Sequence, residues 1–279
     1  GRRWKFNLGL RGSWFAHVGP YSSPDELESF EAGELIQDYW GLEPRFSSRF
    51  QLTPNSSLKA GFTMAWQYLH LVSNSTSTLP FDVWVPSSRL VEPQLGFQYA
   101  LGYFRNFADD AWETSVEVCY RDLNNQIDYR ENYVNDPSME VERNFVFGEG
   151  RAYGVELFLK KRTGRLNGWL GYTLSRTERS FPEIEDGRVF PAVYDRPHDL
   201  SLVLNYQLSP KWEMGFIFVY GTGRAFTPIK SLYLIENNLN VDYGRRNSAR
   251  LDHYHRADVS ATWTPNPDSE KNFTSSWTF

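Results

Sequence analysis

The residues best suited to chemistry in this sequence are its five histidines and the aspartates near them in the chain. They are His17, His70, His198, His253 and His255, with Asp195, Asp199, Asp252 and Asp258. A histidine beside an aspartate can activate water as a general base. Two histidines on one face of a strand, such as His253 and His255, can bind a metal ion. A hydrolase site or a metal site is therefore the first chemistry to consider.

The spacing of these residues favours neither kind of site. The sequence has no His-Glu-x-x-His motif and no Ser-His-Asp arrangement. The histidines all fall at expected strand ends on the side of the long connections, where a histidine commonly forms interfacial hydrogen bonds. We therefore predict that the chain is not an enzyme and has neither a cofactor nor a resident metal ion. A hydrolase at this rim stays open as the alternative.

The elements that position these residues are strands joined by connections that alternate in length. The short connections cover residues 53–57, 106–111, 162–165, 208–211 and 265–271, and the long ones cover 17–39, 72–93, 128–151, 179–199 and 227–255. Outer-membrane β-barrels have short turns on one side of the membrane and long loops on the other. The alternation therefore predicts such a barrel, and a soluble sandwich would not require it.

Hydrophobic residues alternate with polar residues along the expected strands. In the first strand Trp4, Phe6, Leu8 and Leu10 share one face, and Lys5, Asn7 and Arg11 share the other. Similar apolar rows occupy 58–68, 112–120, 200–208 and 212–220. A row of about five residues matches a membrane strand of roughly 9–11 residues. Aromatic residues at the row ends would form the girdles at the two membrane interfaces.

Composition narrows the class further. The chain has 279 residues, a net charge of −5 and one cysteine, Cys119, which excludes an internal disulfide. No apolar run is long enough for a membrane helix, and the absence of a basic stripe excludes a nucleic-acid partner. We predict an all-β fold, an antiparallel transmembrane β-barrel segment with ten full strands and an eleventh at 272–279. No second apolar set is present to cover the rows, as a soluble layered sheet would need.

Several blocks of the sequence resemble the barrel of TonB-dependent outer-membrane receptors. They include Glu43-Pro44-Arg45-Phe46, Gly150-Arg151-Ala152-Tyr153-Gly154-Val155-Glu156, Tyr194-Asp195-Arg196-Pro197-His198-Asp199-Leu200 and the stretches 58–61, 83–88, 117–129 and 254–260. The resemblance runs from about Gly41 to the end and is closest to receptors of the Bacteroidota type. It implies a barrel of about 22 strands closed by an N-terminal plug. Residues 1–279 would then be the C-terminal half of that single barrel domain, without the plug.

The resemblance also implies a function. A receptor of this family sits in the bacterial outer membrane and imports a scarce nutrient, which would be a ferric chelate, cobalamin, an oligosaccharide or a peptide. Its expected partners are the TonB complex acting through the plug, outer-membrane lipids, the nutrient ligand and a surface lipoprotein over the loops. The alternative is a self-contained barrel of 10–12 strands that acts as a passive pore or a rim hydrolase. An odd strand count with free edges in lipid disfavours this alternative.

Two sets of residues are the predicted sites. The ligand-binding set lies in the long loops and combines aromatic and basic groups: Phe81, Trp84, Tyr233, Tyr243, Arg245, Arg246 and Arg250. Such groups suit anionic chelates or glycans, and they suit anionic lipid headgroups equally well. The set facing the lumen and plug is Arg11, Arg45, Arg49, Glu117, Arg121 and Glu156. A polar inner wall is needed in a plugged or an open barrel, so the second set does not identify the substrate.

Overall fold

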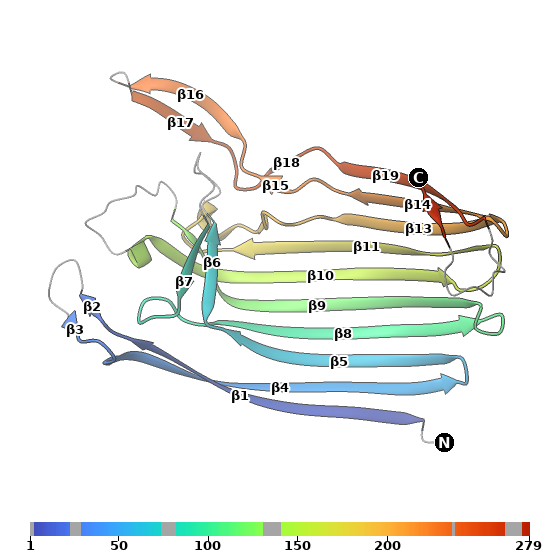
Figure 1. Ribbon diagram of the computed structural model, residues 1–279. Coiled ribbons are helices and arrows are strands. Elements are labelled where there is room, and N and C mark those ends of the chain that lie inside the picture. The colour runs from blue at the N-terminus through green and yellow to red at the C-terminus, as the bar shows by residue number, and fades with distance from the viewer. Residues whose placement is uncertain (1–2, 23–28, 74–81, 131–140, 236–237, 266–274) are drawn as a thin grey trace.

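The computed structural model describes residues 3–22, 29–73, 82–130, 141–235, 238–265 and 275–279. Its main element is one antiparallel sheet that curves into a wall (Figure 1). The strands of this wall are, in order, β1 (Trp4–Val18), β4 (Leu35–Thr53), β5 (Ser56–Gln67), β8 (Gln94–Phe107), β9 (Trp112–Tyr129), β10 (Phe145–Lys161), β11 (Leu166–Ser180), β13 (His198–Ser209), β14 (Trp212–Gly221), β19 (Tyr254–Trp263) and β20 (Trp277–Thr278). Ten long strands followed by a short eleventh confirm the predicted all-β fold.

The connections lie on two different ends of the wall, as the sequence predicts. Both chain ends and the short turns lie at one end in Figure 1, and the long loops project from the other. The loops carry small elements of their own: β2 (Tyr21–Ser22), β3 (Ser29–Phe30), β6 (Leu69–Ser73), β7 (Asp82–Pro86), η1 (Val141–Asn144), η2 (Glu185–Gly187), β12 (Phe190–Pro191), β15 (Ala225–Phe226), β16 (Ile229–Ile235), β17 (Asn238–Tyr243) and β18 (Ala249–Arg250). Of the predicted short connections, 265–271 falls almost wholly outside the described residues.

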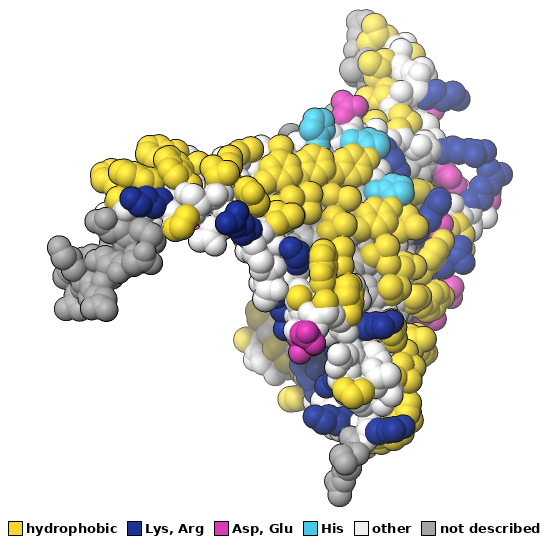
Figure 2. Space-filling model, turned by 90° about the vertical axis from the view of Figure 1, so that its right-hand side faces the viewer, with side chains coloured by type: hydrophobic (Ala, Val, Ile, Leu, Met, Phe, Trp, Pro, Cys, Tyr) yellow, Lys and Arg dark blue, Asp and Glu magenta, His cyan; other side chains and the backbone are white. Residues whose placement is uncertain are grey.

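The two faces of the wall differ as the alternation predicts. Hydrophobic side chains gather along the convex side, which we call the outer face (Figure 2). Leu8 on this face is 77% exposed, which only a lipid environment would make favourable. Aromatic rings meet across neighbouring strands, with centroids 5.2 Å apart for Phe62 and Tyr99 and 6.5 Å apart for Tyr99 and Tyr120. We call this band the tyrosine belt, and the concave side the inner face.

Tyr68 departs from the predicted outward row of residues 58–68. Its hydroxyl lies 2.8 Å from Ser13 Oγ, and its ring stacks on Phe15 with centroids 5.3 Å apart. Both partners belong to the polar face of β1. Strand β5 ends at Gln67 and β6 begins at Leu69, so Tyr68 lies between the two strands. Face alternation is lost at such a break, and Tyr68 therefore turns to the inner face.

The buried hydrophobic residues lie beneath the long loops. One cluster joins Val72, Val85, Val91, Ile127, Tyr129 and Phe145, and a second joins Val146, Phe181, Ile184 and Phe190. These clusters pack the β6–β7 hairpin and the segment around η2 against the ends of β9, β10 and β11. The core therefore orders the loops, while hydrogen bonds between strands order the wall. Among the described residues, no helix has the length and hydrophobicity to cross a membrane.

Candidate functional site

One group of predicted lumen residues gathers around a buried carboxylate. Glu43 on β4 is 1% exposed and lies 3.5 Å from the guanidinium groups of both Arg11 and Arg45. Ser13 Oγ donates a further bond of 3.2 Å to Glu43 Oε1. The two arginines are exposed, so the cluster presents positive charge to the lumen. The sequence prediction omitted Glu43, although its parity with Arg45 placed both on one face.

Three cations form a row across the inner face near the short turns. The strand register sets Lys5 opposite Arg49 and Arg49 opposite Lys59. All three side chains are exposed, and no carboxylate within the described ranges pairs with any of them. Lys59 Nζ lies 3.5 Å from the centroid of the Phe104 ring. Like charges directly opposite one another destabilise a sheet, so this cation row calls for negative charge in the lumen.

Two glutamates face one another further along the same wall. Glu117 on β9 lies opposite Glu156 on β10 in the register. Ser115 Oγ donates a bond of 3.4 Å to Glu117. Arg121 lies further along β9 from Glu117, on the same face. It is exposed and has Gln98 and Ala152 opposite it. Glu117, Glu156 and Arg121 therefore form no ion pair within the described strands.

The long loops bury a charged pair at the point where three of them meet. Arg246, between β17 and β18, is 6% exposed and lies 2.6 Å from the carboxylate of Asp128 at the loop end of β9. Its backbone N–H donates to a carboxylate oxygen of Glu185 in η2. Asn247 Nδ2 donates a bond of 2.9 Å to the carbonyl of Pro191. The guanidinium of Arg246 is therefore buried inside the loops, whereas the sequence predicts that it contacts a ligand.

Arg250 on β18 also pairs with a buried carboxylate. Its guanidinium forms an ion pair with the buried carboxylate of Asp195 and donates a bond of 2.8 Å to the carbonyl of Asp195. Asp195 Oδ1 also accepts a bond of 2.6 Å from the backbone N–H of Thr177 on β11. This pair ties the last long loop to the wall. Arg250 thus cross-links β18 to Asp195, and Asp195 is held by both Arg250 and the backbone of Thr177.

Arg245, the third arginine predicted to bind ligand, lines an open pocket between η2 and the base of the β16–β17 hairpin. This loop pocket has a volume of about 460 Å³ and is lined by Glu185, Asp186, Arg188, Lys230, Tyr243, Gly244 and Arg245. The cations Arg188, Lys230 and Arg245 are exposed, and Lys230 Nζ lies 3.7 Å from Asp242. The predicted residues Tyr243 and Arg245 therefore come together here. Arg188 and Lys230 were missed because no local motif links two separate loops.

The other predicted ligand residues lie elsewhere on the loops. Trp84 on β7 is 60% exposed, and Tyr233 on β16 is 48% exposed. Neither lines the loop pocket. Phe81 lies outside the described residues. Exposed rings on two hairpins are suitable for stacking on a ligand that extends beyond the pocket, and this role stays a prediction.

The bonded histidines pair with hydroxyl groups. His198 Nδ1 shares a hydrogen bond of 2.8 Å with the Tyr172 hydroxyl, and His253 Nδ1 shares one with the Tyr220 hydroxyl. Tyr172 and Tyr220 belong to the outer face, so these pairs lie on the convex side of the wall. His70 is buried and bonds to Ser87 Oγ at 3.0 Å. In the part of the chain that the structure describes, no three His, Cys, Asp or Glu side chains are grouped to hold a metal ion.

The comparisons with known proteins agree with this architecture. The family model "TonB dependent receptor-like, beta-barrel" matches residues 1–279. No curated protein sequence is similar enough to this chain to count as a match. The family match does not test the resemblance to the Bacteroidota branch, which stays a prediction.

Three solved structures illustrate the similarity of fold. The FrpB iron transporter from Neisseria meningitidis has a TM-score of 0.61 and 14% identity, with 95% of this chain aligned to 35% of that chain. The ferric-catecholate import receptor Fiu from E. coli K12 has a TM-score of 0.59 and 14% identity, with coverages of 95% and 37%. The ferripyoverdine receptor of the Pseudomonas aeruginosa outer membrane has a TM-score of 0.54 and 14% identity, with coverages of 82% and 28%. The chain spans about a third of the length of these structures.

Proposed function

Because this chain belongs to the TonB dependent receptor-like β-barrel family of outer-membrane proteins, we propose that it is part of a transporter that imports a scarce nutrient with TonB-coupled energy. Strands β1 and β20 form the two edges of the described sheet. Unpaired backbone groups at an edge are costly in lipid. This supports a barrel in which further strands pair with both edges, so that residues 1–279 form one part of a single barrel domain.

The nutrient that the loops fit best is an anionic ferric chelate. The observation that carries this proposal is the loop pocket, which Arg188, Lys230 and Arg245 line beside Tyr243, together with Asp186 and with Glu185, whose carboxylate accepts a bond from the Arg246 backbone. Guanidinium groups bind anionic oxygens through charge-assisted hydrogen bonds, and an aromatic ring can stack on a chelating group. The printed names of the similar structures, an iron transporter, a ferric-catecholate receptor and a ferripyoverdine receptor, favour this class. Cobalamin, an oligosaccharide and a peptide rank below it.

The charges on the inner wall are evidence for a plug in the lumen. The cation row of Lys5, Arg49 and Lys59 and the opposed pair of Glu117 and Glu156 lack partners among the described strands. A plug with complementary charges would neutralise both, and the TonB complex would act on the protein through that plug. The surface lipoprotein expected over the loops stays a prediction without a contact that supports it.

The passive pore and the rim hydrolase have less support. His198 and His253 pair with tyrosines on the outer face, His70 pairs with Ser87, and Asp195 is held by Arg250 and Thr177. Within the described residues, none of these contacts joins a histidine to an aspartate. Family and similar structures are receptors and transporters.

Uptake of iron chelates tests the proposal. The outer-membrane protein that carries this chain would be expressed in cells lacking other iron receptors, and entry of ⁵⁵Fe-labelled catecholate and hydroxamate chelates would be measured. We expect uptake that stops when the proton gradient is collapsed. Replacing Arg188, Lys230 and Arg245 with Gln should weaken chelate binding roughly tenfold or more, and Lys211→Gln at the short-turn end should not. The proposal would be overturned if uptake continued after the proton gradient is collapsed. It would also be overturned if the triple variant bound the chelate as tightly as the parent protein.

A further inference from the structure

Five cations gather on the inner face of the first three strands of the wall. The cation row of Lys5, Arg49 and Lys59 lies across β1, β4 and β5 near the short turns, and Arg11 and Arg45 lie closer to the loops on β1 and β4. We call these five residues the cation stripe. Arg45 and Arg49 are four residues apart on one strand, so they share a face and lie roughly 13 Å apart along it. The stripe therefore has an upper level, Arg11 and Arg45, and a lower level, the cation row.

The strand register continues the cation row into residues of opposite charge. Lys59 lies opposite Gly102 on β8, and Gly102 lies opposite Glu117 on β9. Glu117 lies opposite Glu156 on β10, and the same row reaches Asp199 on β13. One row across the wall thus has cations on β1, β4 and β5 and carboxylates on β9, β10 and β13. An anion in the lumen would be attracted to the first three strands and repelled by the later ones.

A buried carboxylate holds the upper level of the stripe in place. Arg11 and Arg45 each lie 3.5 Å from Glu43, whose side chain is 2% exposed, while their own side chains are 65% and 51% exposed. The single carboxylate balances one of the two positive charges, so one positive charge remains in excess at this level. Two guanidinium groups on a fixed base suit an anionic ligand, because each can donate further bonds to anionic oxygens.

Small side chains separate the two levels. The register row between them contains Asn7 on β1, Ser47 on β4 and Gly61 on β5. A Cβ atom built at Gly61 would meet nothing closer than the carbonyl oxygen of Phe46 at 3.9 Å, so the wall is open at this point. An anion could therefore move from one level to the other without displacing a bulky side chain.

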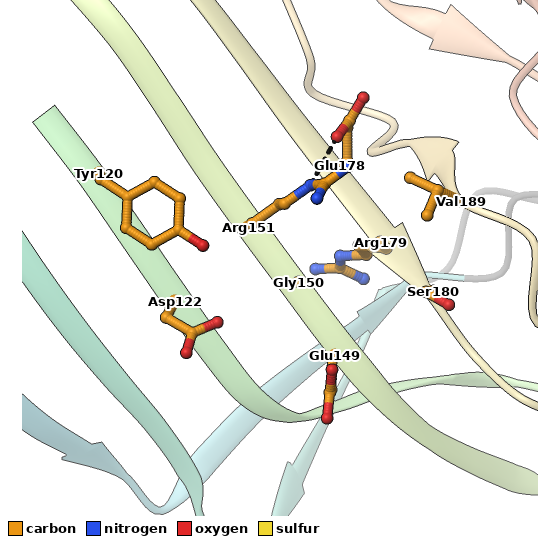
Figure 3. Close-up of a pocket in the computed structure, with 9 residues that line it drawn as sticks. All are labelled: Tyr120, Asp122, Glu149, Gly150, Arg151, Glu178, Arg179, Ser180 and Val189. Carbon is orange, nitrogen blue, oxygen red and sulfur yellow. Dashed lines mark hydrogen bonds and ion pairs between the residues drawn. The ribbon is translucent and has the colours of Figure 1, made fainter.

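The pocket on strands β9, β10 and β11 arranges its charges differently (Figure 3). Its lining sets Asp122, Glu149 and Glu178 against Arg151 and Arg179. Arg151 Nε donates a bond of 2.8 Å to Glu178, so positive and negative groups balance one another locally. A pocket of mixed charge does not select anions, whereas the cation stripe does.

We propose that the cation stripe is the path along which a multiply charged anionic ligand crosses the barrel. The inference rests on the proposed transport function, in which the ligand first binds at the loop pocket. The ligand would then bind at the upper level of the stripe and next at the cation row, on its way to the short-turn end. A seated plug would occupy the cation row with its own negative charges, and the ligand would replace them when the plug moves. Contacts between exposed charges are weak, so the ligand can leave each level.

Uptake of chelates of graded charge tests the stripe. The full outer-membrane protein would be expressed in cells lacking other iron receptors and supplied with ⁵⁵Fe catecholate chelates that share one core and differ only in their number of carboxylates. In the double variant Arg49→Gln and Lys59→Gln, we expect uptake at saturating ligand to slow roughly fivefold for the most highly charged chelate and less than about twofold for the least charged. Affinity at the loop pocket should stay unchanged. Arg11 and Arg45 are left in place, because removing them would leave Glu43 buried without a partner.

Two further variants provide the controls. Arg121→Gln removes an exposed inner-face cation on β9, outside the stripe, and should leave the uptake of every chelate unchanged. Arg49→Lys keeps the charge of the cation row and should retain the uptake rates of the parent protein. Heat-modifiable migration on gels would verify that each variant is a folded barrel.

The dependence on ligand charge separates this inference from the proposed function. Collapse of the proton gradient tests energised import, and a loss that grows with ligand charge would support the stripe whether entry is energised or passive. A double variant that slows every chelate by the same factor would show that the cation row acts only through the plug. That result, or parent uptake rates for all chelates in the folded double variant, would overturn the proposal.

Discussion

The inner wall and the loop layer handle charge in opposite ways. On the wall, like charges stand opposite one another, as for Arg49 between Lys5 and Lys59. In the loops, opposite charges are buried in pairs, as for Arg246 with Asp128. Removing one partner of a buried pair costs about 3–5 kcal/mol, whereas an exposed charge contributes about 0–1 kcal/mol. The chain therefore fixes the conformation of its loops by itself and leaves the charges of its wall for a partner.

This difference matches the two tasks that the proposed transport function would require. A ligand pocket must hold its donors in place, and the buried pairs beneath the loop pocket hold Arg245 and Tyr243 on an ordered base. A wall that contacts a movable plug must be able to release it. Exposed charges in a wet lumen interact weakly enough to form and break. The predictions below test this contrast, beginning with the largest expected effect.

The largest effect is expected from Arg246→Ala. The change leaves the carboxylate of Asp128 buried without its partner, so local stability of the loop layer should fall by about 3–5 kcal/mol. Hydrogen exchange of the amides around 185–191 and 246–250 would measure this loss. Arg245→Ala is the control. The Arg245 side chain is exposed, so its removal should change the local stability by less than about 0.5 kcal/mol. Equal exchange in the two variants would contradict the proposed contrast.

Glu43→Gln tests a place where the inner wall, like the loops, buries a charge beside opposite charges. Glu43 is buried and joins Arg11, Arg45 and Ser13, so the neutral amide should cost about 1–3 kcal/mol. Thermal unfolding of the barrel in detergent would show a lower midpoint for this variant. Glu117→Gln removes a carboxylate that faces another carboxylate, and it should leave the midpoint unchanged or raise it. A lower midpoint for Glu117→Gln alone would be evidence against the charge arrangement described for the wall.

Acidification should loosen the β6–β7 hairpin, a smaller change because it titrates one ring without removing a side chain. Burial lowers the pKa of His70 below its ordinary value of 6.5, so the folded hairpin keeps the ring neutral. The unfolded hairpin binds more protons in this range, so stability is fully present above pH 6.5 and is lost as pH falls below it. Hydrogen exchange of residues 69–73 between pH 8 and pH 5 would follow the loss. In His70→Gln the pH dependence should disappear.

Much of this wall could be predicted from the sequence, because face alternation depends only on local parity. The alternation predicts that Arg11, Arg45 and Arg49 share one face, and Arg11 and Arg45 both contact Glu43. It could not show that Lys5, Arg49 and Lys59 stand in one row, since the register between strands depends on turn geometry. It also failed at Tyr68, where β5 breaks before β6 begins.

The loop layer was predicted less well, for a different physical reason. The sequence showed Arg246 and Arg250 as basic residues beside aromatic ones, which suggested ligand contacts. Their partners are Asp128 at the loop end of β9 and Asp195 in the segment before β13, and both are far away in the chain. Whether a loop arginine faces solvent or a buried carboxylate is decided by how several loops pack together. No pattern within a single loop records that packing.

The smallest effect is expected from Arg49→Gln, and it is the most informative about the lumen. Removing the central charge of the cation row relieves its opposition to Lys5 and Lys59, so the barrel without a plug should gain about 0.2–1 kcal/mol per relieved pair. With an acidic plug segment in place, the same change removes an attraction and should destabilise the protein. Unfolding midpoints of Arg49→Gln in the full protein and in a plug-deleted form would compare the two. A gain in both forms would mean that no negative partner faces this row.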